Sequence, residues 1–146
     1  MRKTFWITVV LLASLGLAGG QTAQAPHIVA KGKFIGRKGN LTQTIFTPTQ
    51  AGIYRVSTYF VLTTPDLASK GEWAVFESWT DDAGQEQGGL IVVLDASSSP
   101  NVFGSSSVVI EAVAGTPLGI QTVHSDQSHT TVYSLYYVVE SVVLLP

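Results

Sequence analysis

One stretch, residues 46–62 with the sequence FTPTQAGIYRVSTYFVL, limits the fold more than any other feature of this chain. After the turn signal at Gly52 its side chains alternate, and successive side chains of a β-strand point to opposite faces of a sheet. One face is apolar enough for a core and holds Tyr54, Val56, Thr58, Phe60 and Leu62. The other is aromatic, apolar and charged, which is unusual for a face that contacts only water. The stretch therefore predicts a long central strand with both faces covered.

The rest of the chain predicts further strands and no helix. Runs of strand-forming residues recur at 72–80, 90–94, 102–113, 118–123 and 133–145. Short strands separated by Gly, Pro and Asp turns are typical of an all-β sandwich or barrel. We expect residues 90–94 to be buried on both sides, because they form a continuous apolar run.

The first 25 residues have the pattern of a signal peptide. Arg2 and Lys3 precede an apolar run over residues 5–17, and Ala23 and Ala25 supply small residues before a cleavage site. The run is shorter than the roughly 20 apolar residues of a membrane span. We therefore expect an exported protein that is secreted, periplasmic or held at the cell surface, with no membrane span after cleavage.

We expect a basic arm or edge strand over residues 26–44 and one domain over residues 45–146. No cysteine occurs in the chain, so no disulfide can hold the domain and its stability depends on its core. Without Arg2 and Lys3, six basic and ten acidic residues remain. Four of the six basic residues lie in the 26–44 segment, so the domain itself is acidic. This charge distribution argues against nucleic acid as a partner.

Three short motifs resemble the tumour necrosis factor and complement globular-head superfamily. Residues 46–56 contain Phe-Thr-Pro followed by Gly-Ile-Tyr-Arg-Val, as in the core strand of that family. Residues 114–118 are similar to its late turn, and residues 133–139 to its closing aromatic strand. The resemblance implies a jelly-roll β-sandwich that forms a compact homotrimer and works by recognition. The chain lacks the collagen-like stalk of some members, and its signal segment suggests a bacterial member, so receptor binding is not carried over.

The second faces of two strands predict a subunit interface. Apolar and aromatic residues occur on both faces of residues 53–62 and 133–145, and exposed patches of that extent usually mark an interface. The residues that we expect there are Ile53, Arg55, Tyr59, Tyr137 and Glu140. We expect the one charged pair among them, Arg55 and Glu140, to form an ion pair between adjacent strands. The alternative is a monomer in which loops or the arm cover these faces.

The sequence offers no catalytic constellation, and we expect neither an enzyme nor a cofactor. The chain has no thiol, and its serine clusters lack the Gly-x-Ser-x-Gly elbow of a hydrolase. His124, Asp126 and His129 are the closest approach to a metal-ligand set. We expect them to be ordinary loop residues, because so few ligands are present.

Trp73, Glu77 and Trp79 share one face of the strand at 72–80 and form a candidate ligand face. Aromatic rings beside a carboxylate can stack on and hydrogen-bond to a sugar, although the same pattern also occurs on ordinary outward faces. The sequence thus leaves three hypotheses: a trimeric binding module, a structural subunit of an extracellular fibre whose arm pairs with a neighbouring sheet, and a carbohydrate-binding domain.

We expect the exported chain to begin at Pro26, because the small residues Ala23 and Ala25 precede it. N-terminal sequencing of protein recovered from outside the cytoplasm measures this directly. Recovery of a chain that still begins at Met1 would contradict the predicted export.

Overall fold

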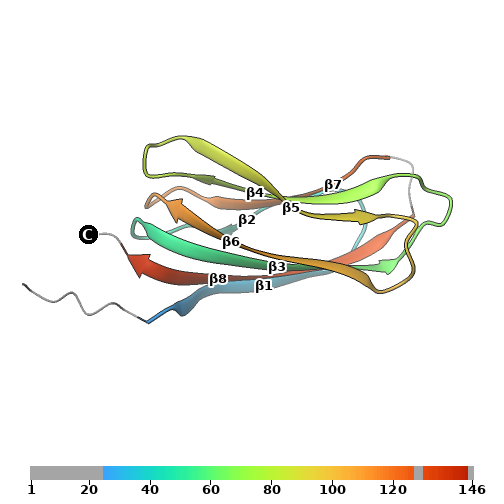
Figure 1. Ribbon diagram of the computed structural model, residues 1–146, viewed down its shortest axis with the longest axis horizontal. Coiled ribbons are helices and arrows are strands. Elements are labelled where there is room, and N and C mark those ends of the chain that lie inside the picture. Colours follow the sequence, from blue (N-terminus) through green and yellow to red (C-terminus); the bar gives the residue numbers. More distant parts are fainter. Residues whose placement is uncertain (1–24, 127–129, 145–146) are drawn as a thin grey trace, which may run out of the picture.

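The computed structural model describes residues 25–126 and 130–144, which form an antiparallel β-sandwich (Figure 1). The expected signal peptide lies outside the described residues, apart from Ala25. The described part of the chain contains no helix long and apolar enough to cross a membrane. Its strands are β1 (His27–Arg37), β2 (Leu41–Phe46), β3 (Gly52–Thr64), β4 (Glu72–Thr80), β5 (Glu86–Asp95), β6 (Val102–Ala112), β7 (Leu118–His124) and β8 (Val132–Leu144).

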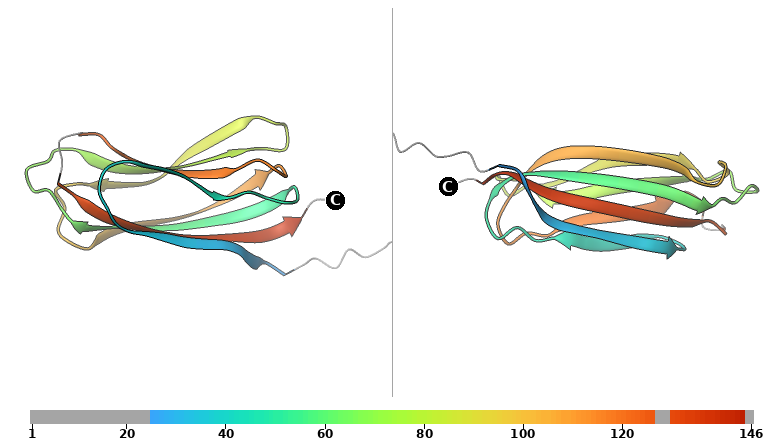
Figure 2. Two further views of the ribbon diagram at one scale, coloured as in Figure 1. Left: turned by 180° about the vertical axis from the view of Figure 1, so that it is seen from behind. Right: turned by 90° about the horizontal axis from the view of Figure 1, so that it is seen from below.

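The strands form two four-stranded sheets packed face to face. Sheet A has the order β1-β8-β3-β6, and sheet B has the order β2-β7-β4-β5. The right panel of Figure 2 views sheet A from its outer side, with β8 and β3 in the middle. Eight antiparallel strands exchanged between two sheets in this order define a jelly roll, so the predicted all-β fold class is confirmed.

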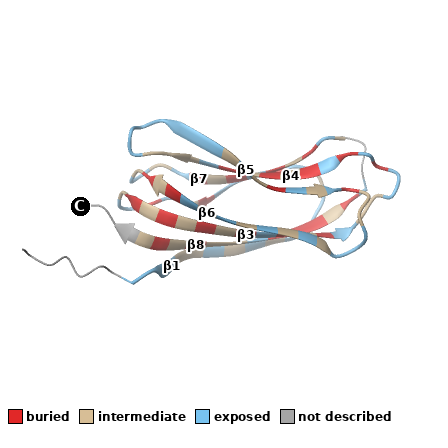
Figure 3. Cartoon of the chain, viewed as in Figure 1, coloured by how far each residue is buried: buried red, intermediate tan, exposed pale blue. Residues whose placement is uncertain are grey.

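Strand β3 alternates as its sequence predicts. Tyr54, Val56 and Phe60 point into the sandwich and are buried, whereas Tyr59 points outward and is exposed. The alternation is visible along β3 in Figure 3. The strand begins at Gly52 after a turn in which the Tyr54 hydroxyl donates a hydrogen bond to the Gln50 carbonyl (2.7 Å).

An aromatic cluster joins the two sheets. Trp73 of sheet B lies 4.6 Å from Tyr133 and 6.0 Å from Phe60, ring centre to ring centre, and all three side chains are fully buried. The Trp73 indole donates to the Thr131 hydroxyl (3.0 Å). The Tyr133 hydroxyl shares a hydrogen bond with the Thr122 hydroxyl (2.7 Å) and donates to the Gly39 carbonyl (3.1 Å). The cluster thus buries its polar atoms only where they have partners.

Two segments differ from a simple interpretation of the sequence. The prediction that residues 90–94 are buried on both sides is wrong, because Leu90 is 56% and Val93 44% exposed. They lie on β5, an edge strand of sheet B, whose outer side is open. The basic segment 26–44 holds two edge strands, β1 in sheet A and most of β2 in sheet B.

Replacing Tyr133 by Phe should lower the free energy of unfolding by about 1–3 kcal/mol. The change leaves the buried Thr122 hydroxyl and the Gly39 carbonyl without their shared partner. Urea denaturation of the variant measures the loss. Tyr137→Phe removes the same hydroxyl from a partly buried ring off the outer face of sheet A and is the matched control, expected within about 0.5 kcal/mol of the wild type. Equal losses in the two variants would contradict this role of the Tyr133 hydroxyl.

Candidate functional site

The outer face of sheet A, which we call the sheet A face, carries a contiguous exposed aromatic cluster. Tyr59 on β3 pairs with Tyr136 on β8, and the neighbouring Val61 pairs with Phe103 on β6. The Tyr59 ring centre lies 5.9 Å from that of Tyr136 and 5.3 Å from that of Phe103. All three rings are more than a third exposed, and Val109 adds a side chain that is 59% exposed. Exposed apolar area gathered on one face is a common feature of interaction surfaces.

Two members of this cluster, Tyr136 and Phe103, are absent from the predicted interface. Both could have been found from their positions. Tyr136 has the same parity as Glu140 on β8, and Phe103 has the same parity as Val109 on β6. The alternation of side chains along each strand therefore predicts that both residues point outward.

Tyr137 does not lie on the sheet A face, so its predicted placement is wrong. It pairs with the buried Thr58, packs partly buried against the core, and stacks on Phe34 of β1 at 6.0 Å. Gly32, its partner on β1, provides the room, because a Cβ atom there would collide with the Tyr137 ring. The remaining predicted interface residues, Ile53, Arg55, Tyr59 and Glu140, are on the face, where Ile53 and Arg55 are partly exposed.

The expected ion pair between Arg55 and Glu140 is present. The two residues pair across β3 and β8, and Arg55 Nη1 lies 3.4 Å from Glu140 Oε2. Both side chains are partly exposed (43% and 29%), so the pair contributes at most about 1 kcal/mol. Its main consequence is that neither charge is left alone beside the apolar cluster.

The two edges of the sheet A face carry opposite charges. Lys31 and Lys33 are exposed on the outer side of β1. The alternate residues Gly32 and Phe34 point toward the inside of the sandwich. Glu111 lies on the outer side of β6, since its neighbours Ile110 and Ala112 are buried. The face therefore has two lysines at its β1 edge and one glutamate at its β6 edge.

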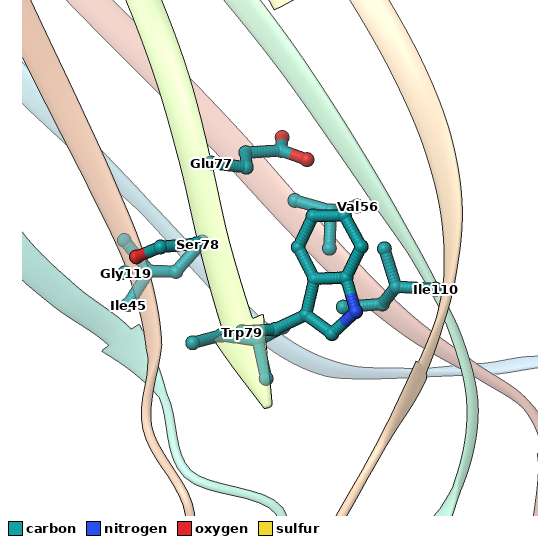
Figure 4. Close-up of a pocket in the computed structure, with 8 residues that line it drawn as sticks. Ile45, Val56, Glu77, Ser78, Trp79, Ile110 and Gly119 are labelled. Carbon is teal, nitrogen blue, oxygen red and sulfur yellow. The ribbon is translucent and has the colours of Figure 1, made fainter. Parts of the chain in front are cut away.

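Trp73, Glu77 and Trp79 do not form an outward ligand face, so that hypothesis is wrong. Trp73 is fully buried and Glu77 is 4% exposed. Figure 4 shows Glu77 and Trp79 extending from one side of β4 toward Val56 and Ile110, with Ser78 on the opposite side. The three residues share a face, as predicted, but it is the face that packs between the sheets.

Glu77 is a buried carboxyl group without a partner. Neither of its oxygens has a hydrogen-bond partner among the described residues. The residues around it are apolar or small, and the space between them does not admit a water molecule. These neighbours are Ile45, Val56, Ser78, Trp79, Ile110, Leu118 and Gly119. Because burial disfavours the charged form, it raises the pKa of Glu77 from 4.5 to about 7.

The described residues provide no metal site. They contain no group of three or more His, Cys, Asp or Glu side chains that could hold an ion. The His124 ring is buried against Trp73 (4.9 Å between ring centres), and its Nδ1 accepts a hydrogen bond from the Asp126 amide (3.0 Å). His129 lies outside the described residues. His124 therefore packs against the core and does not extend from a loop tip.

No protein-family model matches the sequence, and no curated protein matches it significantly. Among solved structures, the chain is similar to a pentameric capsid protein isolated from metagenomic phage sequences, with a TM-score of 0.42 and 19% identity over 98% of this chain and 82% of that one. It is also similar to the CBM22-1 xylan-binding domain from Paenibacillus barcinonensis, with a TM-score of 0.43 and 12% identity over 84% of this chain and 99% of that one.

The stability of the domain should fall as the pH rises from about 5 to about 8, because the folded state holds a proton on Glu77 that the unfolded chain releases near pH 4.5. A shift from 4.5 to about 7 corresponds to about 3 kcal/mol of unfolding free energy, present at low pH and lost as pH rises through 7. Urea denaturation at a series of pH values measures the fall.

The control for this measurement is Glu77→Gln, which keeps the size of the side chain and cannot ionise. Its stability relative to the wild type should rise by about 3 kcal/mol over the same range. The carboxyl groups of Asp66, Asp81 and Asp95 do not interfere. Their hydrogen bonds lower their pKa values below 3.8, so they titrate at lower pH. Parallel curves for the two proteins would contradict a protonated Glu77.

Proposed function

We propose that the protein is a non-enzymatic binding and assembly module that forms a homotrimer through the sheet A face and acts outside the cytoplasm. The observation that supports this proposal is the exposed cluster of Tyr59, Phe103 and Tyr136. Interfaces are enriched in aromatic residues because large rings bury much area at low cost in conformational entropy.

The charges on the sheet A face support a second copy of this chain as the partner. Lys31 and Lys33 lie at the β1 edge and Glu111 at the β6 edge, so the basic edge of one copy complements the acidic edge of another. A contact between two different edges is heterologous, and heterologous contacts produce rings when the rotation closes. The Arg55–Glu140 pair lies between these edges and leaves no net charge in the middle of the contact.

Closure after three copies is proposed from the resemblance to the tumour necrosis factor and complement-head superfamily, whose jelly rolls are commonly trimers. The same contact without closure would form an open filament, which is the fibre hypothesis. Mass in solution separates the two, because a ring has one size and a filament has many.

Replacing Tyr59 by Glu should convert the trimer to monomers while the β-sheet spectrum is retained. The exposed ring can be replaced without disturbing the core, but a carboxylate between Phe103 and Tyr136 would be buried in the contact without a partner, at a cost of several kcal/mol. Light scattering after size-exclusion chromatography gives the mass, and circular dichroism reports the fold.

Leu67→Glu is the matched control, because Leu67 is 78% exposed in the loop between β3 and β4 and lies off the sheet A face. It should remain a trimer. A wild-type protein that is monomeric at high concentration would overturn the proposed assembly. A ladder of masses would favour the fibre.

A further inference from the structure

The outer side of sheet B is hollowed at the end where β4 separates from β7. The two strands pair as far as Ser78 and Gly119, after which β4 continues to Thr80 paired only with β5. Figure 1 shows the β4–β5 hairpin extending away from the sheet at this end. Pro117 precedes β7 and borders the opening.

Two adjoining hollows, with volumes of about 400 and 280 Å³, form one groove at this place. They share Ser78 and Pro117. Their other lining residues come from β2, β4, β5 and β7, and are Thr42, Gln43, Thr44, Gly119, Trp79, Thr80, Glu86 and Gln87. Volumes of this size are typical of sites for small ligands.

We propose that this groove binds a neutral oligosaccharide. Its lining supplies hydroxyl groups at outward positions of β2 and β4, from Thr42, Thr44, Ser78 and Thr80. Such groups donate and accept hydrogen bonds, which suits the many hydroxyls of a sugar chain. The backbone groups of the paired strands bond within the sheet, so the side chains must make the contacts.

The surroundings of the groove narrow the ligand class further. Phe76 lies two residues before Ser78 on the same face of β4, and its partner Leu90 is 56% exposed. They provide an apolar border for the C–H faces of sugar rings. Glu86 is the only charged side chain among the lining residues, and no basic residue is present to neutralise a phosphate, sulfate or uronate.

The groove also differs from a peptide site. It runs from β2 across β7 to β4, and an added peptide strand would instead lie along the edge of a sheet. This site lies on the outer side of sheet B, so it depends neither on the sheet A face nor on the inward residues Trp73 and Glu77.

Titration calorimetry of the full exported chain tests the proposal. The probes are unbranched hexasaccharides of glucose, xylose, mannose or N-acetylglucosamine, with hexagalacturonate as the anionic comparison. We expect at least one neutral hexasaccharide to bind with a dissociation constant of roughly millimolar or tighter, and hexagalacturonate to bind at least about tenfold more weakly. Failure of all four neutral probes, or equal binding of the anionic one, would overturn the proposal.

Two variants locate the binding. Ser78→Tyr fills the groove with a ring at an exposed strand position and should weaken binding by about tenfold or more. Thr44→Val removes one hydroxyl without changing side-chain shape and should weaken it by about three- to tenfold. Val93→Tyr, on β5 outside the groove lining, is the matched control and should bind as the wild type does. Unchanged binding in both Ser78→Tyr and Thr44→Val would overturn the assignment to this groove.

Discussion

The packing of Trp73 between the sheets is the interaction on which the rest of the structure depends. The chain has no cysteine, so only the core holds sheet A against sheet B. Trp73 from sheet B contacts Phe60 and Tyr133 from the two central strands of sheet A. Because side chains alternate along a strand, the inward direction of these three residues determines which faces of β3, β4 and β8 point inward wherever the strands pair regularly. A slip of one residue in any of them would turn its core face toward solvent.

The same alternation determines what the protein presents to its surroundings. Phe60 points inward, so Tyr59 points outward, and Leu135 points inward, so Tyr136 points outward. The sheet register then brings these two outward rings side by side. The sheet A face is thus a consequence of core packing and of the large residues that occupy the outward positions. A strand that served only the core would carry small polar residues there, as β6 does at Ser105 and Ser107.

The sequence shows that side chains alternate between two faces of a strand. It does not always show which of the two faces points into the core. The sequence groups Trp73, Glu77 and Trp79 correctly, but a glutamate suggests an outward face. Burying an indole of about 200 Å² contributes about 5 kcal/mol, which exceeds the roughly 3 kcal/mol lost by keeping Glu77 neutral at high pH. The face with the tryptophans therefore packs inward, and Glu77 is buried because it lies on the same face.

The sequence also assigned Tyr137 to the wrong face, for a related reason. Strand β8 is apolar on both sides, and only Gly32 and Phe34 on its neighbour show which side has room for a ring.

The two outer faces of the sandwich are chemically different, and this difference gives the proposed functions their geometry. The sheet A face is aromatic with charged edges, whereas the groove on sheet B is lined by hydroxyl groups. A trimer joined through the sheet A face would bury the aromatic rings and leave three grooves directed outward, because the two sheets lie back to back.

Each groove alone would bind a sugar chain weakly, since hydroxyl contacts exchange with water at little net gain in free energy. Three grooves on one rigid assembly would raise the effective affinity for a repeating glycan by about a hundredfold or more without any new contact. Assembly and recognition would then depend on opposite faces of the same fold, so a change on one face would leave the chemistry of the other intact.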